Sequence, residues 1–288
     1  MGGFAMLRPL PSLCLSMSHP ILHFAHANSY PAGTYGMFFE QLRAHYDVRA
    51  LPIHAHNPRF PVDDGWRTLA RELREELERS YTEPVILVGH SMGGILALMA
   101  ARKRPALVRC VVLLDSPIVA GWRAHLLRLA KILKYESRHS PSVASARRRD
   151  NWPDMEAAYQ HYAAKSLFAA WPQQVLRDYV QHGLVPQPGG GVRLRFSRET
   201  ETAVYRTIPH HLGRLARQTY PVPVGFVGGV DSVECRLAGL DATRRLVGPN
   251  FLQIAGGHLF PMESPVEAAQ ATHAMIGQLL QGRGLEVE

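Results

Sequence analysis

Short apolar runs alternate with amphipathic stretches along most of the 288-residue chain. This alternation is typical of parallel β-α-β units, in which each buried strand is followed by a helix that packs on the sheet. The run from Val85 to Val88 is apolar on both of its alternating faces, as expected for a central strand that helices cover on both sides. The pattern predicts an α/β fold with a mostly parallel sheet of about six strands, at Pro20–Ala25, Tyr46–Ile53, Val85–Gly89, Val108–Asp115, Val222–Gly228 and Phe251–Ala255.

Helices are expected between these strands. Asp63 or Asp64 can cap a helix that runs to about Ser80. A second helix should begin at Ser91, and a last one should run over about residues 264–280. One apolar stripe on the first of these helices faces the sheet in this interpretation and comprises Trp66, Leu69, Leu73 and Leu77.

The alternation of strands and helices stops after Asp115. The following hundred or so residues have no convincing strand pair, contain several tryptophans and tyrosines, and include a Pro/Gly break at Pro186–Gly191. Because the sheet pattern resumes at Pro221, we interpret residues 116–220 as a helical cap rather than a separate domain. The core of the fold is then formed by residues 17–115 and 221–288.

The first residues of the chain do not follow this pattern. Residues 1–16 carry a weakly apolar stretch that Pro9 and Pro11 interrupt, which makes a poor secretory signal. A segment that is typical of a strand begins soon after Met17. We therefore expect residues 1–16 to be a disordered extension, with a misplaced start codon as the alternative.

Charge and hydropathy exclude two classes of partner. The formal net charge is +8, but the basic residues are spread along the chain and the run Arg147–Arg149 is too short for a nucleic-acid-binding tract. No apolar stretch reaches the roughly 18 residues that a membrane-spanning helix needs. We therefore expect no nucleic-acid partner and no integral membrane segment. The protein is expected to be a monomer or a homodimer.

The three cysteines are far apart and form no C-x-x-C pair, so neither a disulfide framework nor a zinc site is indicated and a cytoplasmic location fits. His54 and His56 follow a strand, as metal ligands can. However, Pro58 and Arg59 stand where a metallohydrolase would have Asp and His. We therefore expect no metal and no cofactor.

The chemistry centres on the stretch from Val85 to Ile95. It contains G-x-S-x-G, with Ser91 at the centre, between a buried strand and a helix rich in Ala, Leu and Met. A reversal from strand to helix within so few residues strains the central residue and exposes its Oγ at the edge of the sheet. The helix that follows directs its N–H groups at the place where an oxyanion would form. This context predicts a nucleophilic serine.

A serine nucleophile needs a base, and the base needs an acid that orients it. Of 15 histidines, His258 alone follows an apolar strand and precedes the last helix, so it is the expected base. Two residues could be the acid. Asp231 follows the strand 222–228, and Asp115 ends the strand after the nucleophile helix, where it could also cap a helix. We prefer Asp231 and keep Asp115 as the alternative.

Two backbone N–H groups are needed to bind the oxyanion. The first is expected at Met92, where the nucleophile helix begins. The second should come from the loop after the first strand, with Asn28 as the expected donor and its neighbour Ala27 as the alternative. His26 in the same loop is expected to support the shape of the loop.

These motifs resemble those of the α/β-hydrolase superfamily over residues 17–280. The G-H-S-M-G-G elbow at Gly89–Gly94 has the form common in its esterases, lipases and C–C bond hydrolases, and H-A-N-S-Y-P at His26–Pro31 is similar to an H-G-x-P oxyanion loop. The stretch Gly256–Pro265 is similar to the histidine loop of the superfamily, and the insertion has the position of its cap domain. No strand pair is predicted before Pro20, so we expect the usual first two strands of the superfamily to be absent.

These features predict a serine hydrolase that cleaves a carboxylic ester of medium size, a small-molecule apolar acyl ester, with the cap tryptophans around the acyl group. The same residues could serve a C–C bond hydrolase or a thioesterase. A ligand-sensing protein that retains these residues and signals through its cap is the remaining alternative.

Overall fold

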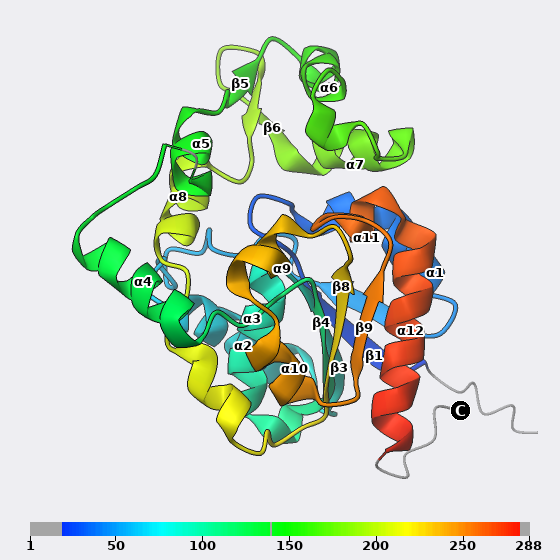
Figure 1. The fold of residues 1–288 in the computed structure, drawn as a ribbon. Coiled ribbons are helices and arrows are strands. Elements are labelled where there is room, and N and C mark those ends of the chain that lie inside the picture. Colours follow the sequence, from blue (N-terminus) through cyan, green and yellow to red (C-terminus); the bar gives the residue numbers. More distant parts are fainter. Residues whose placement is uncertain (1–18, 139, 283–288) are drawn as a thin grey trace, which may run out of the picture.

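Parallel strands form the centre of the protein in a computed structural model that describes residues 19–138 and 140–282. The six-stranded sheet has the order β2-β1-β3-β4-β8-β9, and every neighbouring pair is parallel (Figure 1). All six predicted strands are present, with small shifts at their ends. The extension expected at residues 1–16 lies outside the described residues. The strands are β1 (Ile21–Ala25), β2 (Asp47–Ala50), β3 (Val85–His90), β4 (Val108–Leu114), β8 (Val224–Gly229) and β9 (Phe251–Ile254).

Helices cover both faces of the sheet (Figure 1). Alternate residues of β3 pack into two different clusters, because successive side chains of a strand point to opposite faces. Ile86 and Val88 lie in the cluster that includes helices α1 and α12, whereas Val85 and Leu87 lie in the cluster that includes α2, α3 and α10. These five helices are α1 (Gly36–Leu42), α2 (Arg67–Ser80), α3 (Met92–Lys103), α10 (Asp241–Val247) and α12 (Pro265–Gln281).

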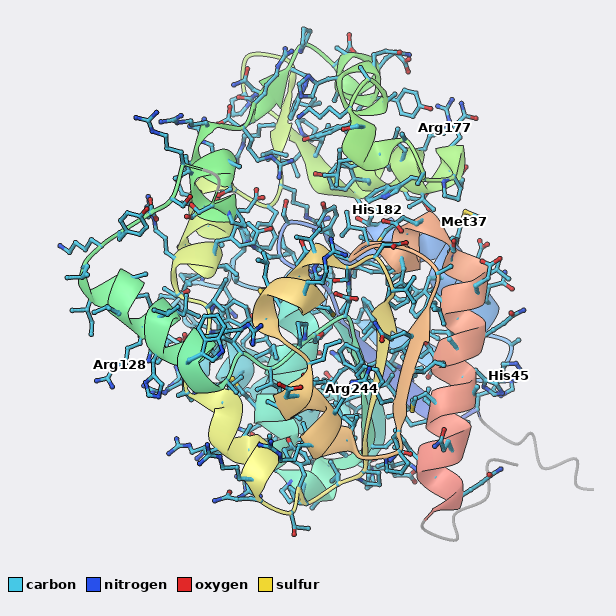
Figure 2. The ribbon with its side chains drawn as sticks, in the orientation of Figure 1. Met37, His45, Arg128, Arg177, His182 and Arg244 are labelled. Atoms are coloured by element: carbon cyan, nitrogen blue, oxygen red, sulfur yellow. The ribbon has the colours of Figure 1, made fainter. Side chains whose placement is uncertain are left out.

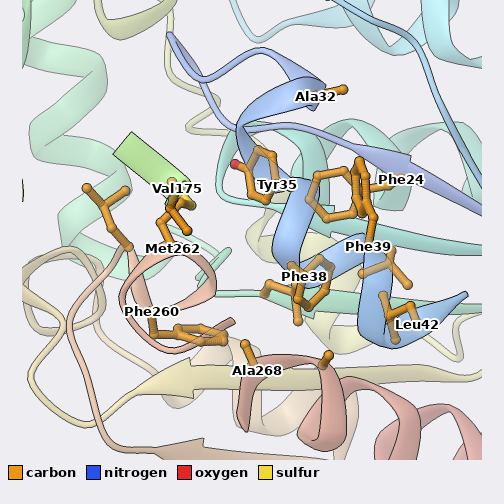
Figure 3. Packing of buried hydrophobic residues seen from close by; sticks show 14 of the residues in the cluster. Phe24, Ala32, Tyr35, Phe38, Phe39, Leu42, Val175, Phe260, Met262 and Ala268 are labelled. Atoms are coloured by element: carbon orange, nitrogen blue, oxygen red, sulfur yellow. The ribbon is translucent and has the colours of Figure 1, made fainter. Parts of the chain in front are cut away.

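An aromatic cluster joins the first strand to the first helix and holds the loop between them. The ring of Phe24 in β1 lies 5.7 Å from that of Phe38 and 5.1 Å from that of Phe39, both in α1. Figure 3 shows these rings close to Leu42, with Ala268 of α12 on the same side of the sheet. The loop after β1, which holds the expected oxyanion donor, is therefore anchored at both ends.

The insertion, defined as the residues between β4 and β8, extends over the carboxyl ends of the strands (Figure 1). Helices predominate in it, as predicted, but our expectation that it has no strand pair was wrong. It contains a small antiparallel sheet in the order β5-β7-β6. The Pro/Gly break at Pro186–Gly191 contains the turn between β6 and β7, where Gly189, Gly190 and Gly191 have positive φ.

The insertion comprises α4 (Gly121–Ile132), α5 (Pro141–Arg147), β5 (Asn151–Trp152), α6 (Met155–Ala163), η3 (Ser166–Phe168), α7 (Gln173–Gly183), β6 (Leu184–Pro186), β7 (Val192–Leu194), α8 (Arg198–Arg206) and η4 (Leu212–Arg217). The remaining elements are η1 (Ala32–Tyr35), η2 (Pro105–Leu107), α9 (Val233–Ala238) and α11 (Phe260–Glu263). Within residues 19–138 and 140–282, no helix combines the length and the apolar character needed to cross a bilayer.

Candidate active site

Ser91 lies in a sharp turn between β3 and α3. Its φ of 53° and ψ of −116° are rare for a residue with a side chain, which indicates local strain. The turn tolerates no bulk at its two flanking glycines. A Cβ at Gly89 would collide with the backbone of Gly93, and a Cβ at Gly93 would collide with the carbonyl oxygen of Ala25. The G-x-S-x-G pattern is therefore a steric requirement of this turn.

The structure brings three of the predicted residues into one hydrogen-bonded chain. His258 Nε2 lies 3.0 Å from Ser91 Oγ, and His258 Nδ1 lies 2.7 Å from Asp115 Oδ1. His258 is in the loop between β9 and α11, and Asp115 directly follows β4. Since an ionised carboxylate only accepts hydrogen bonds, Nδ1 carries a proton and a neutral imidazole can accept the serine proton at Nε2. This geometry can activate a hydroxyl as a nucleophile.

Asp115 is fully buried and is held by four groups. Besides His258, the backbone N–H of Gly229 donates to its Oδ2 at 2.8 Å, and Ser232 Oγ and Cys235 Sγ donate to its Oδ1 at 2.7 and 3.3 Å. Burial raises the pKa of Asp115, but the hydrogen bonds from His258, Ser232 and Gly229 outweigh burial, so the pKa is lowered from its usual value. The carboxylate is therefore ionised wherever His258 is neutral.

This geometry favours Asp115 over Asp231, the acid preferred from the sequence. The side chain of Asp231 is exposed, and no hydrogen bond joins it to His258 among the described residues. Strand β8 lies between β4 and β9, so Asp115 must reach past the end of β8 to meet His258. Gly228 and Gly229 end that strand: a Cβ at Gly228 would lie 3.4 Å from Asp115 Oδ2, and the N–H of Gly229 donates to the same oxygen.

The environment of His258 raises its pKa above the usual 6.5. Burial by itself lowers the pKa, because it disfavours the charged ring. The hydrogen bond with Asp115 and the negative charges of Glu234, Asp115 and Glu263 act in the opposite direction and prevail. Glu234 Oε2 lies 3.9 Å from His258 Nδ1, and its side chain is half exposed.

A second hydrogen-bonded chain, which the sequence analysis missed, links the two loops that flank Ser91. His90 Nε2 donates to the carbonyl oxygen of His258 at 2.8 Å, so His90 Nδ1 is the acceptor for the hydroxyl of Tyr35 at 2.8 Å. The Tyr35 oxygen in turn accepts from the backbone N–H of Ala27 at 3.2 Å. His90 is completely buried, and this burial lowers its pKa to about 3, so the ring stays neutral. His90 and Tyr35 are positioning residues in this arrangement.

These hydrogen bonds distinguish the expected oxyanion donor of the loop after β1, Asn28, from its alternative, Ala27. The N–H of Ala27 is used by Tyr35, whereas the N–H of Asn28 donates to no group among the described residues. Met92 is the first residue of α3, and the first N–H groups of a helix have no acceptor within it. The geometry therefore favours Asn28 over Ala27 as the partner of Met92. His26 supports the loop, because its Nδ1 donates to the carbonyl oxygen of Ala27 and its Nε2 accepts from His54 N.

A largely buried arginine, Arg148, ties the insertion to this loop, in addition to the hydrogen bond from Asn28 Nδ2 to the carbonyl oxygen of Glu201. Arg148 Nη1 donates to Ser29 Oγ and to Glu201 Oε2, both at 2.7 Å. Its Nη2 donates to the hydroxyls of Tyr162 and Tyr179, both at 2.9 Å. Paired charges and neutral hydroxyls thus satisfy the guanidinium, and the loop after β1 cannot separate from the insertion without exposing them.

The three tryptophans of the insertion do not share one environment. Trp152 and Trp171 are buried in the hydrophobic cluster, as is Phe168, whose ring lies 4.8 Å from that of Trp171. Trp122 is 63% exposed at the start of α4, so the expectation that it surrounds an acyl group is not supported.

His54 and His56, the histidines considered as metal ligands, make hydrogen bonds within the protein. His54 Nδ1 lies 3.3 Å from a carboxylate oxygen of Glu72, and His56 Nε2 accepts from Ser197 N at 3.0 Å.

The hydrogen-bonded chain through Tyr35 and His90 can be tested directly with Tyr35→Phe. The change leaves the buried Ala27 N–H and His90 Nδ1 without a partner, which should lower the free energy of unfolding by about 1–3 kcal/mol. The rate at which an active-site-directed fluorophosphonate labels the protein should also fall, because both flanking loops lose their common support. Urea unfolding and labelling kinetics measure the two effects.

Tyr46→Phe is the matched control, since the Tyr46 hydroxyl bonds His273 Nδ1 at 2.8 Å and contacts neither loop. It should lose stability and keep its labelling rate. Equal labelling rates of Tyr35→Phe and Tyr46→Phe would show that the hydrogen bonds of Tyr35 do not position the active site.

Comparison with known proteins agrees with this architecture. The profile of the alpha/beta hydrolase family matches residues 24–271. The sn-1-specific diacylglycerol lipase ABHD11 of Mus musculus is 23% identical over 231 residues, which cover 77% of this chain and 68% of that protein.

Two solved structures share the fold. E-2-(acetamidomethylene)succinate hydrolase superposes with a TM-score of 0.72 at 22% identity, over 90% of this chain and 92% of that chain. The thioesterase domain from the curacin biosynthetic pathway superposes with a TM-score of 0.63 at 19% identity, over 90% of this chain and 91% of that chain.

Proposed function

Because the chain belongs to the alpha/beta hydrolase family, we propose that it is a serine hydrolase that cleaves a carboxylic ester through an acyl-enzyme on Ser91. The observation that carries the proposal is the hydrogen-bonded chain from Ser91 through His258 to the buried Asp115. The similarity to a diacylglycerol lipase supports an ester substrate.

In the proposed reaction, Ser91 Oγ attacks the ester carbonyl carbon while His258 Nε2 accepts the hydroxyl proton. Asp115 keeps the imidazole in the required tautomer and stabilises the imidazolium that forms. The N–H groups of Met92 and Asn28 donate to the tetrahedral oxyanion. The imidazolium then gives its proton to the leaving alcohol, and a water molecule activated by His258 releases the acid.

Substrate contacts from the insertion are expected above Ser91. Burial and the negative charges of Glu201 and Glu234 raise the pKa of Tyr205 in α8, and its hydroxyl interacts with the side chain of Asn28, the expected oxyanion donor. We propose Tyr205 as a residue that contacts the substrate. The acyl group would lie between the insertion and the loop after β1.

The pH dependence of kcat/KM should reflect His258. Below its pKa the imidazole is protonated and cannot accept the serine proton, so activity is lost as the pH falls. Since the pKa is raised, the midpoint of this acidic limb should lie above 6.5. Glu234→Gln removes one of the charges that raise the pKa and should move the limb to lower pH with little change in its plateau. Glu83→Gln, an exposed carboxylate outside the site, should leave the limb in place.

A substrate panel tests the proposal itself. We expect turnover of p-nitrophenyl esters, measured as a function of acyl chain length, with the wild-type protein. Hydrolysis of acyl-CoA or of a vinylogous diketone, with no activity on simple esters, would instead indicate a thioesterase or a C–C bond hydrolase. Slow single-turnover cleavage of every substrate would indicate the ligand-sensing alternative.

A further inference from the structure

Helix α4 exposes its apolar side to solvent. In the helices of globular proteins the apolar stripe normally faces the core. In α4 and the residue after it, four large apolar side chains recur at spacings of four, three and four residues, which places them on one helical face. Their exposed fractions are 63% for Trp122, 55% for Leu126, 50% for Leu129 and 65% for Leu133.

The opposite face of α4 fixes this orientation. Ala124 on that face is buried, and the side chain of Lys131 is only 16% exposed. Its ammonium group donates to Asp64 Oδ1 and to the carbonyl oxygen of Ile208, both at 2.5 Å. The helix is therefore bound to the core through a lysine and presents its leucines outward. A rotation that buried the leucines would leave the Lys131 charge without these partners.

Positive charge flanks the exposed stripe. Arg123 and Lys134 lie to one side of it and Arg128 to the other, and the sequence from Ser116 to Tyr135 contains no Asp or Glu. In Figure 2 the side chain of Arg128 extends away from the body of the protein. None of these three cations forms an ion pair among the described residues. An apolar face with Trp and Leu between cationic borders is the pattern of helices that lie in the interface of a bilayer.

We propose that α4 docks the protein on the surface of an anionic lipid bilayer, with the stripe of Trp122, Leu126, Leu129 and Leu133 in the interfacial region. The charges select this occupant over a second copy of the chain. Two α4 stripes packed together would bring cations of both copies close to each other, whereas lipid phosphates neutralise them. The docking does not depend on the proposed hydrolysis, so it can be measured on the Ser91→Ala protein.

Adjacent apolar residues extend the surface toward the candidate active site. Val233 and Leu237 of α9 are 50% and 72% exposed, and the Arg123 side chain lies directly against Gly239 at the end of α9. The same short segment begins at Ser232, whose hydroxyl donates to Asp115. A bilayer in contact with α4 would therefore lie beside the segment that supports Asp115.

Trp122 offers a direct readout. The chain has four tryptophans, and the other three are buried, with Trp66 6%, Trp152 3% and Trp171 7% exposed. We expect the full-length Ser91→Ala protein to co-sediment with vesicles of phosphatidylcholine and phosphatidylglycerol. Its tryptophan fluorescence should shift to shorter wavelength on binding, and brominated lipid should quench that fluorescence. Binding to pure phosphatidylcholine vesicles should be weaker, and added salt should weaken binding to the anionic vesicles.

Two matched double variants test whether the exposed stripe of α4 binds the bilayer. Leu126→Glu with Leu133→Glu should weaken vesicle binding about tenfold or more, because each leucine loses its burial in the interface. Leu167→Glu with Val266→Glu adds the same charge at exposed positions of η3 and α12 and should bind like the parent protein. Thermal unfolding verifies that all variants fold.

Three results would overturn the proposal. The first is no binding of the parent to anionic vesicles, and the second is equal loss of binding in both double variants. The third is a dimer in sedimentation analysis that the α4 variant dissociates while vesicle binding is absent, which would assign the stripe to a second copy of the chain.

Discussion

Ser91→Ala is expected to reduce ester turnover by about a million-fold while the protein stays folded. The loss follows from chemistry alone, because the variant has no hydroxyl for His258 to deprotonate. The fold should persist, since the strained turn is held by backbone contacts. Ser91 N donates to the carbonyl oxygen of Leu114 at 2.9 Å, and the flanking glycines remain. Turnover and thermal unfolding are the two measurements.

Ser80→Ala is a suitable control, because the Ser80 hydroxyl bonds Glu76 on the surface of α2 and lies outside the site. It should retain wild-type turnover. A Ser91→Ala protein that turned over esters at a large fraction of the wild-type rate would contradict the assignment of the nucleophile.

Asp115→Asn is the second change with a very large expected effect. Asparagine presents an N–H group or a neutral oxygen to His258, which removes the partner that fixes the tautomer and stabilises the imidazolium. A fall in kcat of about ten-thousand-fold is expected. The acidic limb of the pH profile should also move to lower pH in any residual activity, since the carboxylate that raises the pKa of His258 is gone.

Asp231→Asn is the matched comparison, because it makes the same change at the exposed carboxylate that follows β8. It should keep turnover near the wild-type rate. If Asp231→Asn were inactive and Asp115→Asn active, the sequence-based preference would be right and the role given to Asp115 wrong.

The comparison of these two aspartates shows what sequence reasoning could reach. The six strands were predictable because each contains a run of apolar residues. In β3 the run is long enough to show that both faces of the strand are buried. The order of those strands was not predictable from any one run. Only the order β4-β8-β9 explains why the end of β4 can reach His258 past two glycines, Gly228 and Gly229.

Other features were too short or too distant in sequence to detect. Strands β5, β6 and β7 have two or three residues each, so no alternation of apolar and polar positions can be recognised in them. In the hydrogen-bonded chain from Ala27 through Tyr35 and His90 to His258, the last bond alone joins residues that are 168 positions apart. A histidine beside the serine in a completely buried strand was the one available signal, because most buried side-chain polar atoms form hydrogen bonds.

The central claim is that Ser91 is the nucleophile, and peptide mapping after reaction with a fluorophosphonate tests it most directly. The probe phosphonylates a serine only where a base activates the hydroxyl and an oxyanion site receives the phosphoryl oxygen. Mass spectrometry should find the adduct on the peptide that contains Ser91, at one equivalent per chain, and none in the Ser91→Ala protein. An adduct on another residue of the wild-type protein, or undiminished labelling of Ser91→Ala, would contradict the claim.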